Sequence, residues 1–357
     1  MNFRNSDCIF SLLSPVLPSE KRKFVETDKS DFHYFDLIMS REKTAIIAGA
    51  SGVVGKYMIA RAKKEGFRVR ILSASRPSSS QPEYEIYNWD PRAASMNDEQ
   101  ALGELRAALR GSDFLINLAG ESIGEGRFTA RRKKAILESR IAAVAALARA
   151  LRGLDNPPRV WAQASAVGYY GDTGEEPARE ESPLGKLFLS QVCDGWESEA
   201  LDAARELPDM RMFIMRLGLV LSPEAPAWKK MLLPIKMGAG GPLGSGRQWY
   251  SWIDAEDLVR AAFFLAEKKD ATGAYNFTSP EPVRQKEMAA LAAGILRRPC
   301  FLPTPAPILR LALGQMADEL LLASCRALPE RLLEAGFTFD RPGIREECMF
   351  LLKGAPA

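Results

Sequence analysis

The sequence predicts an α/β fold, a doubly wound parallel sheet with a smaller, largely helical C-terminal substrate lobe. Three observations support it: a glycine-rich turn after a short apolar run, strands that alternate with helices between residues 44 and 222, and frequent prolines and glycines beyond Ser222. Alternation at this spacing favours a parallel sheet with right-handed crossovers. Such crossovers bring the strand-end loops to one edge, where ligands of these folds bind.

The first predicted strand runs into a turn that carries three glycines. Residues 44–55 read TAIIAGASGVVG, and helix-forming residues follow directly. Gly49 would let the chain turn sharply, Gly52 would omit a Cβ that blocks a pyrophosphate, and Gly55 would let helix and strand pack closely. The first N–H groups of the helix would bind the anion. We expect a Rossmann-type domain that binds a dinucleotide here, a plain strand-to-helix turn being the alternative. The residues of this cofactor site are Gly49, Ser51, Gly52, Val53, Val54 and Gly55.

The period of the apolar residues predicts the elements that follow. A helix from residue 56 places Met58, Ile59 and Ala62 on one face and ends at Gly66. Short apolar or alternating runs bounded by turn residues predict strands, and longer runs with helical spacing predict helices. The further strands expected are residues 67–72, 84–89, 113–120, 159–165 and 210–221. The further helices expected are residues 98–109, 128–151 and 187–207.

These elements and the local composition divide the chain into four parts. Residues 42–222 form the nucleotide-binding domain, residues 223–302 mix segments of the substrate lobe with the end of that domain, and residues 303–352 form a helical C-terminal domain. Residues 1–41 are expected to be a leader that is disordered or that includes an incorrectly assigned start, with Met39 as an alternative start. Prolines interrupt the apolar stretch of this leader, and no small-residue cleavage site follows it, which speaks against a signal sequence.

Composition excludes several classes of function. The chain has 357 residues, of which 46% are apolar and 26% charged, and its net charge of +3 gives no electrostatic case for binding nucleic acid or an anionic membrane. The only histidine, His33, precedes the predicted domain, so a histidine base, triad or metal cluster is excluded within that domain. The five cysteines show no paired spacing, which argues against disulfides and a zinc site and favours the reducing cytoplasm.

The residues after the second predicted strand favour NADP(H) over NAD(H). A chain that binds NAD would place Asp or Glu about twenty residues beyond the glycine turn, where it contacts the ribose 2′-hydroxyl. Here the residues after Leu72 read SASR, and no carboxylate appears before Glu83. The hydroxyl of Ser75 and the guanidinium of Arg76 suit a 2′-phosphate. The alternative is that Arg76 is a solvated loop residue.

Several motifs carry a resemblance to a known family. They read INLAGESI (116–123), ESR (138–140), ASAVGYYGD (164–172), VCDGWESEA (192–200), GGPLGSGRQWYSWID (240–254) and GQMADELLLASCRALPERLLEAGF (314–337). From Thr44 to Leu352 the chain resembles atypical members of the extended short-chain dehydrogenase/reductase superfamily. These are the NAD(P)-dependent epimerase-like proteins, which have a distinctive C-terminal domain of unknown function.

The resemblance implies a cofactor site that extends beyond the glycine turn. Asp90 would approach the adenine, and Ser165 stands where the superfamily has a hydroxyl that contacts the substrate. The residues implied on the ribose and nicotinamide side are Leu118, Ala119 and Gly120, and Arg140 is a further residue of the cofactor site.

The chain departs from the superfamily at its acid–base pair. Most members use Tyr-x-x-x-Lys, in which the lysine ammonium lowers the pKa of the tyrosine so that the phenol passes a proton as hydride moves. No tyrosine of this chain is followed four residues later by lysine, and the helix that should carry the pair has Leu189 and Cys193 there. Other residues must then donate the proton, and the candidates are Ser165, Tyr169, Tyr170, Cys193 and Asp254. Four of them have a structural alternative to a catalytic role. Tyr169 and Tyr170 would be walls of the pocket, Cys193 a buried hydrophobic residue, and Asp254 the N-cap of a helix.

The glycine- and tryptophan-rich segment 240–252 supplies a candidate rim for the substrate pocket. Aromatic rings with a few polar groups are typical of small-molecule sites, and a guanidinium can hold an anionic substrate. The alternative is that the tryptophans join the two lobes. The candidate substrate-binding residues are Arg247, Gln248, Trp249 and Trp252.

Three functions follow, in order of preference. The first is an NADP(H)-dependent oxidoreductase that acts on a small polar or anionic carbonyl or alcohol through an atypical proton relay. The second is a non-catalytic NADP(H)-binding protein whose partner contacts change with occupancy, and the third is a sugar-nucleotide epimerase or dehydratase, which needs the same missing pair. The expected partner is a small-molecule substrate, with no nucleic acid, membrane or metal. A homodimer is one alternative for the assembly.

Overall fold

The structure, a computed structural model, describes residues 42–74, 84–96 and 98–354. The leader lies outside the described residues, and so do Ser75 and Arg76, the two residues expected to bind a 2′-phosphate. What the sequence predicts for them stays a prediction.

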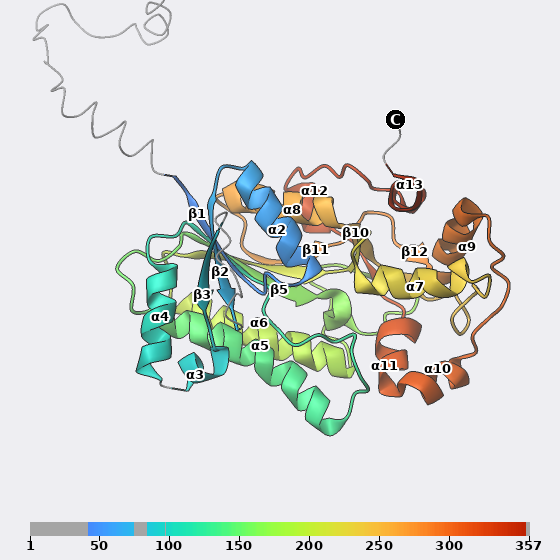
Figure 1. The fold of residues 1–357 in the computed structure, drawn as a ribbon, viewed down its shortest axis with the longest axis horizontal. Coiled ribbons are helices and arrows are strands. Elements are labelled where there is room, and N and C mark those ends of the chain that lie inside the picture. The colour runs from blue at the N-terminus through green and yellow to red at the C-terminus, as the bar shows by residue number, and fades with distance from the viewer. Residues whose placement is uncertain (1–41, 75–83, 97, 355–357) are drawn as a thin grey trace, which may run out of the picture. The chain divides into compact units, whose positions relative to one another are not determined.

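Seven parallel strands form the central sheet (Figure 1). The order across it is β11-β7-β5-β4-β1-β2-β3, so the chain extends from β1 in both directions, as in a doubly wound sheet. Every neighbouring pair is parallel, which confirms the predicted α/β fold. The strands are β1 (Thr44–Ala48), β2 (Arg68–Ser73), β3 (Glu85–Asn88), β4 (Phe114–Asn117), β5 (Val160–Ala166), β7 (Arg211–Leu217) and β11 (Gly273–Phe277).

Helices cover both faces of the sheet (Figure 1). On one face α5 lies alongside α6, and on the other α2 packs against α8. The helices of the first face are α3 (Pro91–Ser95), α4 (Glu99–Leu109), α5 (Ala130–Leu151) and α6 (Phe188–Arg205). Those of the second face are α2 (Val53–Lys64) and α8 (Ala255–Glu267).

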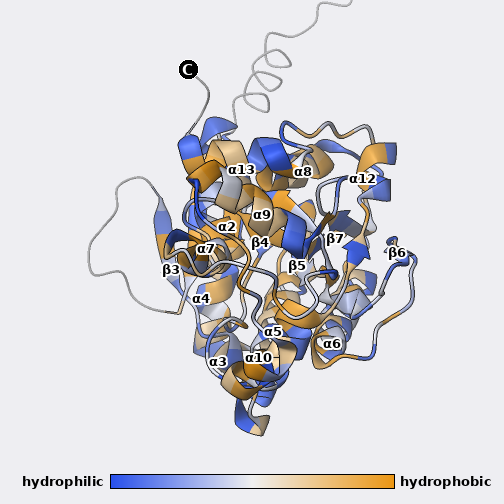
Figure 2. Ribbon diagram, turned by 90° about the vertical axis from the view of Figure 1, so that its right-hand side faces the viewer, coloured by the Kyte–Doolittle hydropathy of each residue, from blue (hydrophilic) through white to orange (hydrophobic). Residues whose placement is uncertain are grey.

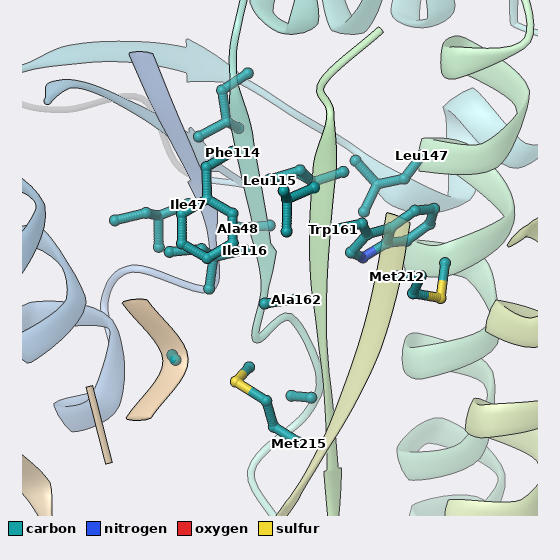
Figure 3. Close-up of a cluster of buried hydrophobic side chains, with 14 of the residues drawn as sticks. Ile47, Ala48, Phe114, Leu115, Ile116, Leu147, Trp161, Ala162, Met212 and Met215 are labelled. Carbon is teal, nitrogen blue, oxygen red and sulfur yellow. The ribbon is translucent and has the colours of Figure 1, made fainter. Parts of the chain in front are cut away.

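The main core lies between the sheet and these helices. Ile47, Leu115 and Trp161 are completely buried, and Figure 3 shows Trp161 of β5 and Leu147 of α5 pointing into the same cluster. Strands that are covered on both faces have near-continuous apolar sequences, which is why these segments are recognisable without a structure. The core holds the strand ends, and hence the loops that follow them, in fixed positions.

The single strand predicted over residues 210–221 is wrong, because the structure divides it at Gly218. β7 stays in the main sheet, whereas β8 (Leu219–Leu221) leaves it and pairs with β10 (Trp252–Asp254). A Cβ at Gly218 would lie 2.7 Å from the carbonyl oxygen of Ser251, so only glycine permits this close approach of two backbones. A contact with a residue that is distant in the sequence therefore ends β7, and the local sequence pattern does not reveal this contact.

Beyond β8 the chain forms several short helices and small two-stranded sheets, and three of these helices, α7, α9 and α13, surround a second apolar cluster. Trp228, Trp252 and Met288 are at its centre and are almost completely buried. Figure 2 shows α7, α9, α10 and α13 on the face turned to the viewer. The helices of this part are α7 (Pro226–Lys236), α9 (Gln285–Leu296), α10 (Ala306–Leu313), α11 (Gln315–Ala317), α12 (Glu330–Glu334) and α13 (Ile344–Lys353). The paired short strands are β9 (Trp249–Tyr250) with β12 (Val283–Arg284), and β6 (Pro177–Ala178) with β13 (Arg326–Ala327).

We expect Gly218→Ala to lower the free energy of unfolding by about 1–3 kcal/mol, because the new Cβ would collide with backbone. The matched control is Gly103→Ala in α4, where a Cβ meets nothing within 4 Å. There alanine should raise stability by about 0.5–1 kcal/mol. Urea unfolding followed by circular dichroism measures both variants. Equal or higher stability of Gly218→Ala would contradict the steric reason given for the strand break.

Candidate functional site

The loops after β1, β4 and β5 are neighbours at one edge of the sheet, because β4 pairs with both other strands in parallel. The loop after β1 is the glycine turn, residues 118–120 follow β4, and a 3₁₀ helix, η1 (Val167–Tyr170), follows β5. The structure therefore brings together the predicted cofactor residues of the first two loops and the candidate proton donors of the third.

The three glycines of the turn differ in what their surroundings require at each position. Gly49 has a φ of +81°, and a Cβ there would lie 2.7 Å from the backbone of Leu118. At Gly55 a Cβ would lie 2.5 Å from the Cα of Ala50, so helix and turn touch. Gly52, by contrast, is exposed, and the nearest atom to its Cβ would be 3.7 Å away. The contacts of the chain require Gly49 and Gly55, whereas no contact within the described residues requires Gly52.

Gly52 is also the N-cap of α2, and no side chain caps this helix. The first turn of α2 contains no acidic residue. Its free N–H groups and the space beside Gly52 fit a diphosphate group, which is the arrangement that binds anions at helix N-termini. Ser51 is exposed at the same turn, and Val53 and Val54 are half-buried.

The loop after β4 is held by a buried amide. Asn117 is completely buried, its Nδ2 donates to Gln163 at 2.9 Å, and its Oδ1 accepts the N–H of Ala119 at 3.1 Å. Leu118 donates its N–H to the carbonyl of Ala48 at 2.9 Å, which ties this loop to the end of β1. The backbone of residues 118–120 is therefore fixed beside the glycine turn.

Arg140 lies behind this loop on α5. Its side chain is nine-tenths buried, and a Cβ at Gly120 would lie 3.0 Å from its Cζ. Nη1 donates to the carbonyl of Ile136 at 2.9 Å, and the guanidinium lies 4.9 Å from the ring centre of Trp196. Burial lowers the pKa of Arg140 to about 10. No carboxylate forms an ion pair with it among the residues that the structure describes.

Asp90 is the N-cap of α3. Its Oδ1 accepts the N–H groups of Arg92 at 2.9 Å and Ala93 at 3.2 Å. The carboxylate therefore stabilises a helix start, and its contact with an adenine stays a prediction.

A buried ion pair lies beneath the end of β5. Glu197 of α6 and Arg216 of β7 are joined twice, Nε to Oε1 at 2.9 Å and Nη2 to Oε2 at 2.7 Å. Ser165 is also buried, and its hydroxyl donates to Glu197 Oε1 at 2.5 Å. Sequence reasoning missed both charged residues. The available signal was an arginine within the apolar strand segment MFIMRL, which needs a buried partner.

The two tyrosines of η1 have different environments. Tyr170 is buried, donates to Asn276 at 2.7 Å and accepts from Nη1 of Arg216 at 2.9 Å, and burial raises its pKa. Tyr169 is half-buried, and its ring centre lies 3.6 Å from the Cζ of Arg216. The hydroxyl of Tyr169 has no hydrogen-bond partner in the described part of the chain.

The positions expected for Tyr-x-x-x-Lys pack directly against η1. A Cβ at Gly168 would lie 3.5 Å from the Cβ of Leu189 and 3.9 Å from the Sγ of Cys193. Cys193 is buried, its Sγ lies 3.6 Å from the carbonyl oxygen of Ala166, and burial raises the pKa of its thiol to about 11. Cys193 is therefore a neutral thiol at neutral pH, and α6 presents neither a phenol nor a cation here.

Two of the four candidate substrate residues are internal. Gln248 is buried and its Nε2 donates to the carbonyl of Leu321 at 2.7 Å, while Trp252 is completely buried and its Nε1 donates to the carbonyl of Glu281 at 2.9 Å. Both side chains therefore make contacts in the interior of the protein.

The other two candidates remain accessible. Arg247 is exposed and Trp249 is half-buried, with the guanidinium of Arg284 lying 3.8 Å from the Trp249 ring centre. Glu175 accepts from Arg284 and, at 3.2 Å, from Nε1 of Trp249. Hydrogen bonds from Arg284 and Trp249 lower the pKa of Glu175 to about 2. This rim is thus a charged and aromatic surface.

Asp254 is the N-cap of α8, as the structural alternative to a role as proton donor predicts. Oδ1 accepts the N–H groups of Glu256 and Asp257 at 3.0 Å each, and Arg341 forms an ion pair with the same oxygen at 2.7 Å. One of its two carboxylate oxygens is therefore occupied inside the fold.

The C-terminal part reaches the start of α6 and the loop after η1. Both carboxylate oxygens of Glu319 accept hydrogen bonds, from the N–H groups of Phe188 and Leu189 at 2.9 Å each, and so cap α6 from a distant segment. Thr173 donates its N–H to the carbonyl of Ser324 at 2.7 Å. Sequence reasoning missed Glu319, because no local capping motif precedes α6.

None of the helices in the described residues is both long and apolar enough to cross a membrane. No group of three or more His, Cys, Asp or Glu side chains among them could hold a metal ion.

Comparison with known proteins agrees with this arrangement. Residues 45–277 match the model of the NAD dependent epimerase/dehydratase family, and residues 304–348 match a domain of unknown function, DUF1731. The epimerase family protein SDR39U1 homolog, chloroplastic, of Arabidopsis thaliana is 34% identical over 85% of each chain. The epimerase family protein YfhF of Bacillus subtilis is 35% identical over 82% of this chain and 92% of its own.

A crystal structure of human epimerase family protein SDR39U1 (isoform2) with NADPH is 26% identical, with a TM-score of 0.76 over 87% of this chain and all of the human chain. The resemblance found in the motifs is thereby confirmed. The chain belongs to the NAD dependent epimerase/dehydratase family and carries the DUF1731 domain at its C-terminal end.

Proposed function

We propose that this protein is an NADP(H)-dependent oxidoreductase that acts on a small polar carbonyl or alcohol. The observation that carries the proposal is the open, uncapped N-terminus of α2 at Gly52, within a turn whose other two glycines are required by internal contacts. The crystallisation of the human relative with NADPH supports the choice of cofactor. The sequence SASR after β2, which lacks a carboxylate, supports it independently.

The residues present fit a dinucleotide along the edge of the sheet. The N–H groups at the start of α2 would hold the diphosphate, Arg76 the 2′-phosphate, and the backbone of residues 118–120 the ribose on the nicotinamide side. When bound, the nicotinamide supplies or accepts a hydride. The chain itself must then orient the substrate and hold or move one proton.

Among the proposed donors, Tyr169 fits the proton transfer best. Ser165 already donates its hydrogen to Glu197, Tyr170 is enclosed between Asn276 and Arg216, and Cys193 is a buried thiol. The hydroxyl of Tyr169 has no partner among the residues that the structure describes, and its half-buried ring lies on the guanidinium of Arg216. It also follows Gly168, which packs on the part of α6 where the superfamily has its tyrosine and lysine.

Arg247 and Trp249 are the proposed substrate contacts, because they are the accessible members of the candidate rim. A guanidinium and an aromatic face suit a substrate with a polar or anionic head and a flat or apolar body. Gln248 and Trp252 support them from the interior.

A second function, non-catalytic binding of NADP(H), is favoured by one observation, the absence of a phenol and a cation at Leu189 and Cys193. Incubation of the protein and NADPH with a library of polar carbonyls separates the two functions. Oxidation of NADPH by any member supports the oxidoreductase. Tight binding without oxidation by any member supports the binding protein, and an altered sugar stereocentre without net oxidation would indicate an epimerase.

We expect Gly52→Val to weaken NADPH binding by at least about a hundredfold, because its side chain would fill the space proposed for the diphosphate. The stability of the free protein should fall by about 1 kcal/mol or less, since valine is only a poorer N-cap. Calorimetric titration and urea unfolding measure the two effects. Gly103→Val on α4 is the control, with unchanged affinity. Unchanged binding by Gly52→Val would reject this phosphate site.

We expect Arg76→Ala to weaken NADPH binding by about tenfold to hundredfold, because a charge-assisted contact with the 2′-phosphate is lost. NADH lacks this phosphate, so its affinity should not change. Fluorescence titration with both reduced cofactors tests the pair. Equal losses for NADH and NADPH would show that Arg76 does not recognise the phosphate.

We expect Tyr169→Phe to lower kcat by about 10²–10⁴ for any carbonyl that the library identifies, with an unchanged Kd for NADPH. The reason is that the phenylalanine keeps the ring on Arg216 but removes the proton. Tyr275→Phe on β11 is the control and should retain wild-type turnover. A wild-type kcat for Tyr169→Phe would transfer the role to another group.

A further inference from the structure

We infer that the part of the chain beyond β8 has a face that docks on the surface of an anionic lipid bilayer. Residues 226–240 and 297–311 form this face, and they include α7, α10 and the loop before α10. We call it the α7–α10 face. Both helices lie on the side of the molecule that Figure 2 turns to the viewer. The inference goes beyond the proposed function, because none of these residues belongs to the proposed cofactor site.

Exposed apolar side chains gather on the α7–α10 face. Seven large apolar side chains are more than half exposed among the described residues, and six of them belong to this face. Exposed apolar residues that are scattered singly are normal, whereas a group of them on one surface marks a site of interaction. The six are Leu233, Met237, Phe301, Leu302, Ile308 and Leu311.

Helix α10 buries little of its own apolar surface. Its sequence, APILRLAL, contains one polar residue, Arg310, and yet only Leu309 is buried. A helix that is apolar on all sides is normally covered on all sides. In the described part of the chain no element covers the outer side of α10, where Leu311 is 78% exposed.

Backbone contacts hold the two segments of the face together. Leu302 donates its N–H to the carbonyl of Gly240 at 3.1 Å. A Cβ at Gly238 would lie 3.8 Å from the Cγ of Pro299. The end of α7, where Met237 lies, is therefore next to the loop before α10. The exposed apolar side chains of the two segments form one surface rather than two.

The same surface is basic. No Asp or Glu occurs between residues 225 and 253 or between residues 288 and 317, although the chain has 45 of them among 357 residues. On α7 the exposed Lys229, Leu233 and Lys236 are four and three residues apart, so cations and apolar groups share one side of the helix. The basic residues of the face are Lys229, Lys230, Lys236, Arg297, Arg298 and Arg310.

Most of these cations have no carboxylate partner in the protein. Arg310 pairs with Asp318 at 2.8 Å, but no ion pair joins Lys229, Lys236, Arg297 or Arg298 to a carboxylate among the described residues. All four of these side chains are exposed. The net charge of the whole chain, +3, conceals this local excess, and for that reason it predicts no attraction to a membrane.

The chemistry of the α7–α10 face suits lipid better than protein. Lysine is depleted in protein–protein interfaces, and a symmetric contact between two copies would place the cations of this face against one another. An anionic bilayer satisfies both parts of the surface. Its phosphate groups attract the lysines and arginines, and its boundary between headgroups and acyl chains receives the exposed Phe, Leu, Ile and Met side chains.

Flotation of the full chain with vesicles tests the inference. We expect binding to vesicles of equal parts phosphatidylcholine and phosphatidylglycerol, no binding to phosphatidylcholine alone, and a loss of affinity as salt is added. Phe301→Ser should weaken binding to the mixed vesicles by about tenfold, because an inserted ring is lost. Met96→Ser is the matched control, since Met96 is 79% exposed but lies outside the face, and its affinity should not change.

The cations are tested by charge reversal. Lys229→Glu combined with Lys236→Glu should weaken binding to the mixed vesicles by about a hundredfold. Lys64→Glu combined with Lys269→Glu changes the net charge equally at exposed positions elsewhere and should have a much smaller effect. Every variant keeps residues 1–41, so any binding by them is common to all. Urea unfolding shows whether the variants are folded, and Phe301→Ala and lysine-to-glutamine changes replace any that are not.

Several results would overturn the inference. The first is a lack of binding to the mixed vesicles, and the second is an equal loss in the face variants and their controls. A dimer in sedimentation equilibrium that Phe301→Ser dissociates, without vesicle binding, would assign the face to a second copy. Retention on immobilised polyglutamate without vesicle binding would assign it to an acidic protein. These measurements need no NADPH, so they do not depend on the proposed function.

Discussion

The buried ion pair of Glu197 and Arg216 is the interaction on which the strand-end edge depends. It joins α6 to β7, and its hydrogen bonds to Ser165 and Tyr170 include the end of β5 and η1. Loss of either partner would leave a buried charge without compensation, which destabilises proteins by about 3–5 kcal/mol. The position of Tyr169 follows from the same pair, because its ring lies on the Arg216 guanidinium.

The polar network continues into the DUF1731 domain. Asn276 accepts from Tyr170, and its Nδ2 donates to the carbonyl of Leu328 at 2.9 Å. Glu180 accepts the N–H groups of Asn276 at 3.0 Å and Arg331 at 3.3 Å. Hydrogen bonds are directional, so a segment held by buried polar groups has a narrower choice of position than one held by apolar contact alone. The C-terminal domain is therefore part of the framework of the site.

The fold and the geometry of the glycine turn can be predicted from local patterns, because these depend on residues that are neighbours in the sequence. The turn at Gly49, with its φ of +81°, is one example. Prediction fails where a distant residue decides, as at Gly218, where the approach of another backbone ends β7. The pairing of Glu197 with Arg216 produces no periodic pattern in the sequence. The segment around Trp252 has the composition of a pocket rim, although Trp252 itself belongs to a hydrophobic core.

A lysine at position 193 would disturb this arrangement. Cys193 and Glu197 are one helical turn apart on α6, so a lysine would pair with Glu197 and compete with Arg216 for its carboxylate. Arg216 would then be buried with its charge partly uncompensated, and Ser165 would lose part of its acceptor. A small neutral thiol keeps the pair intact but removes the cation from α6.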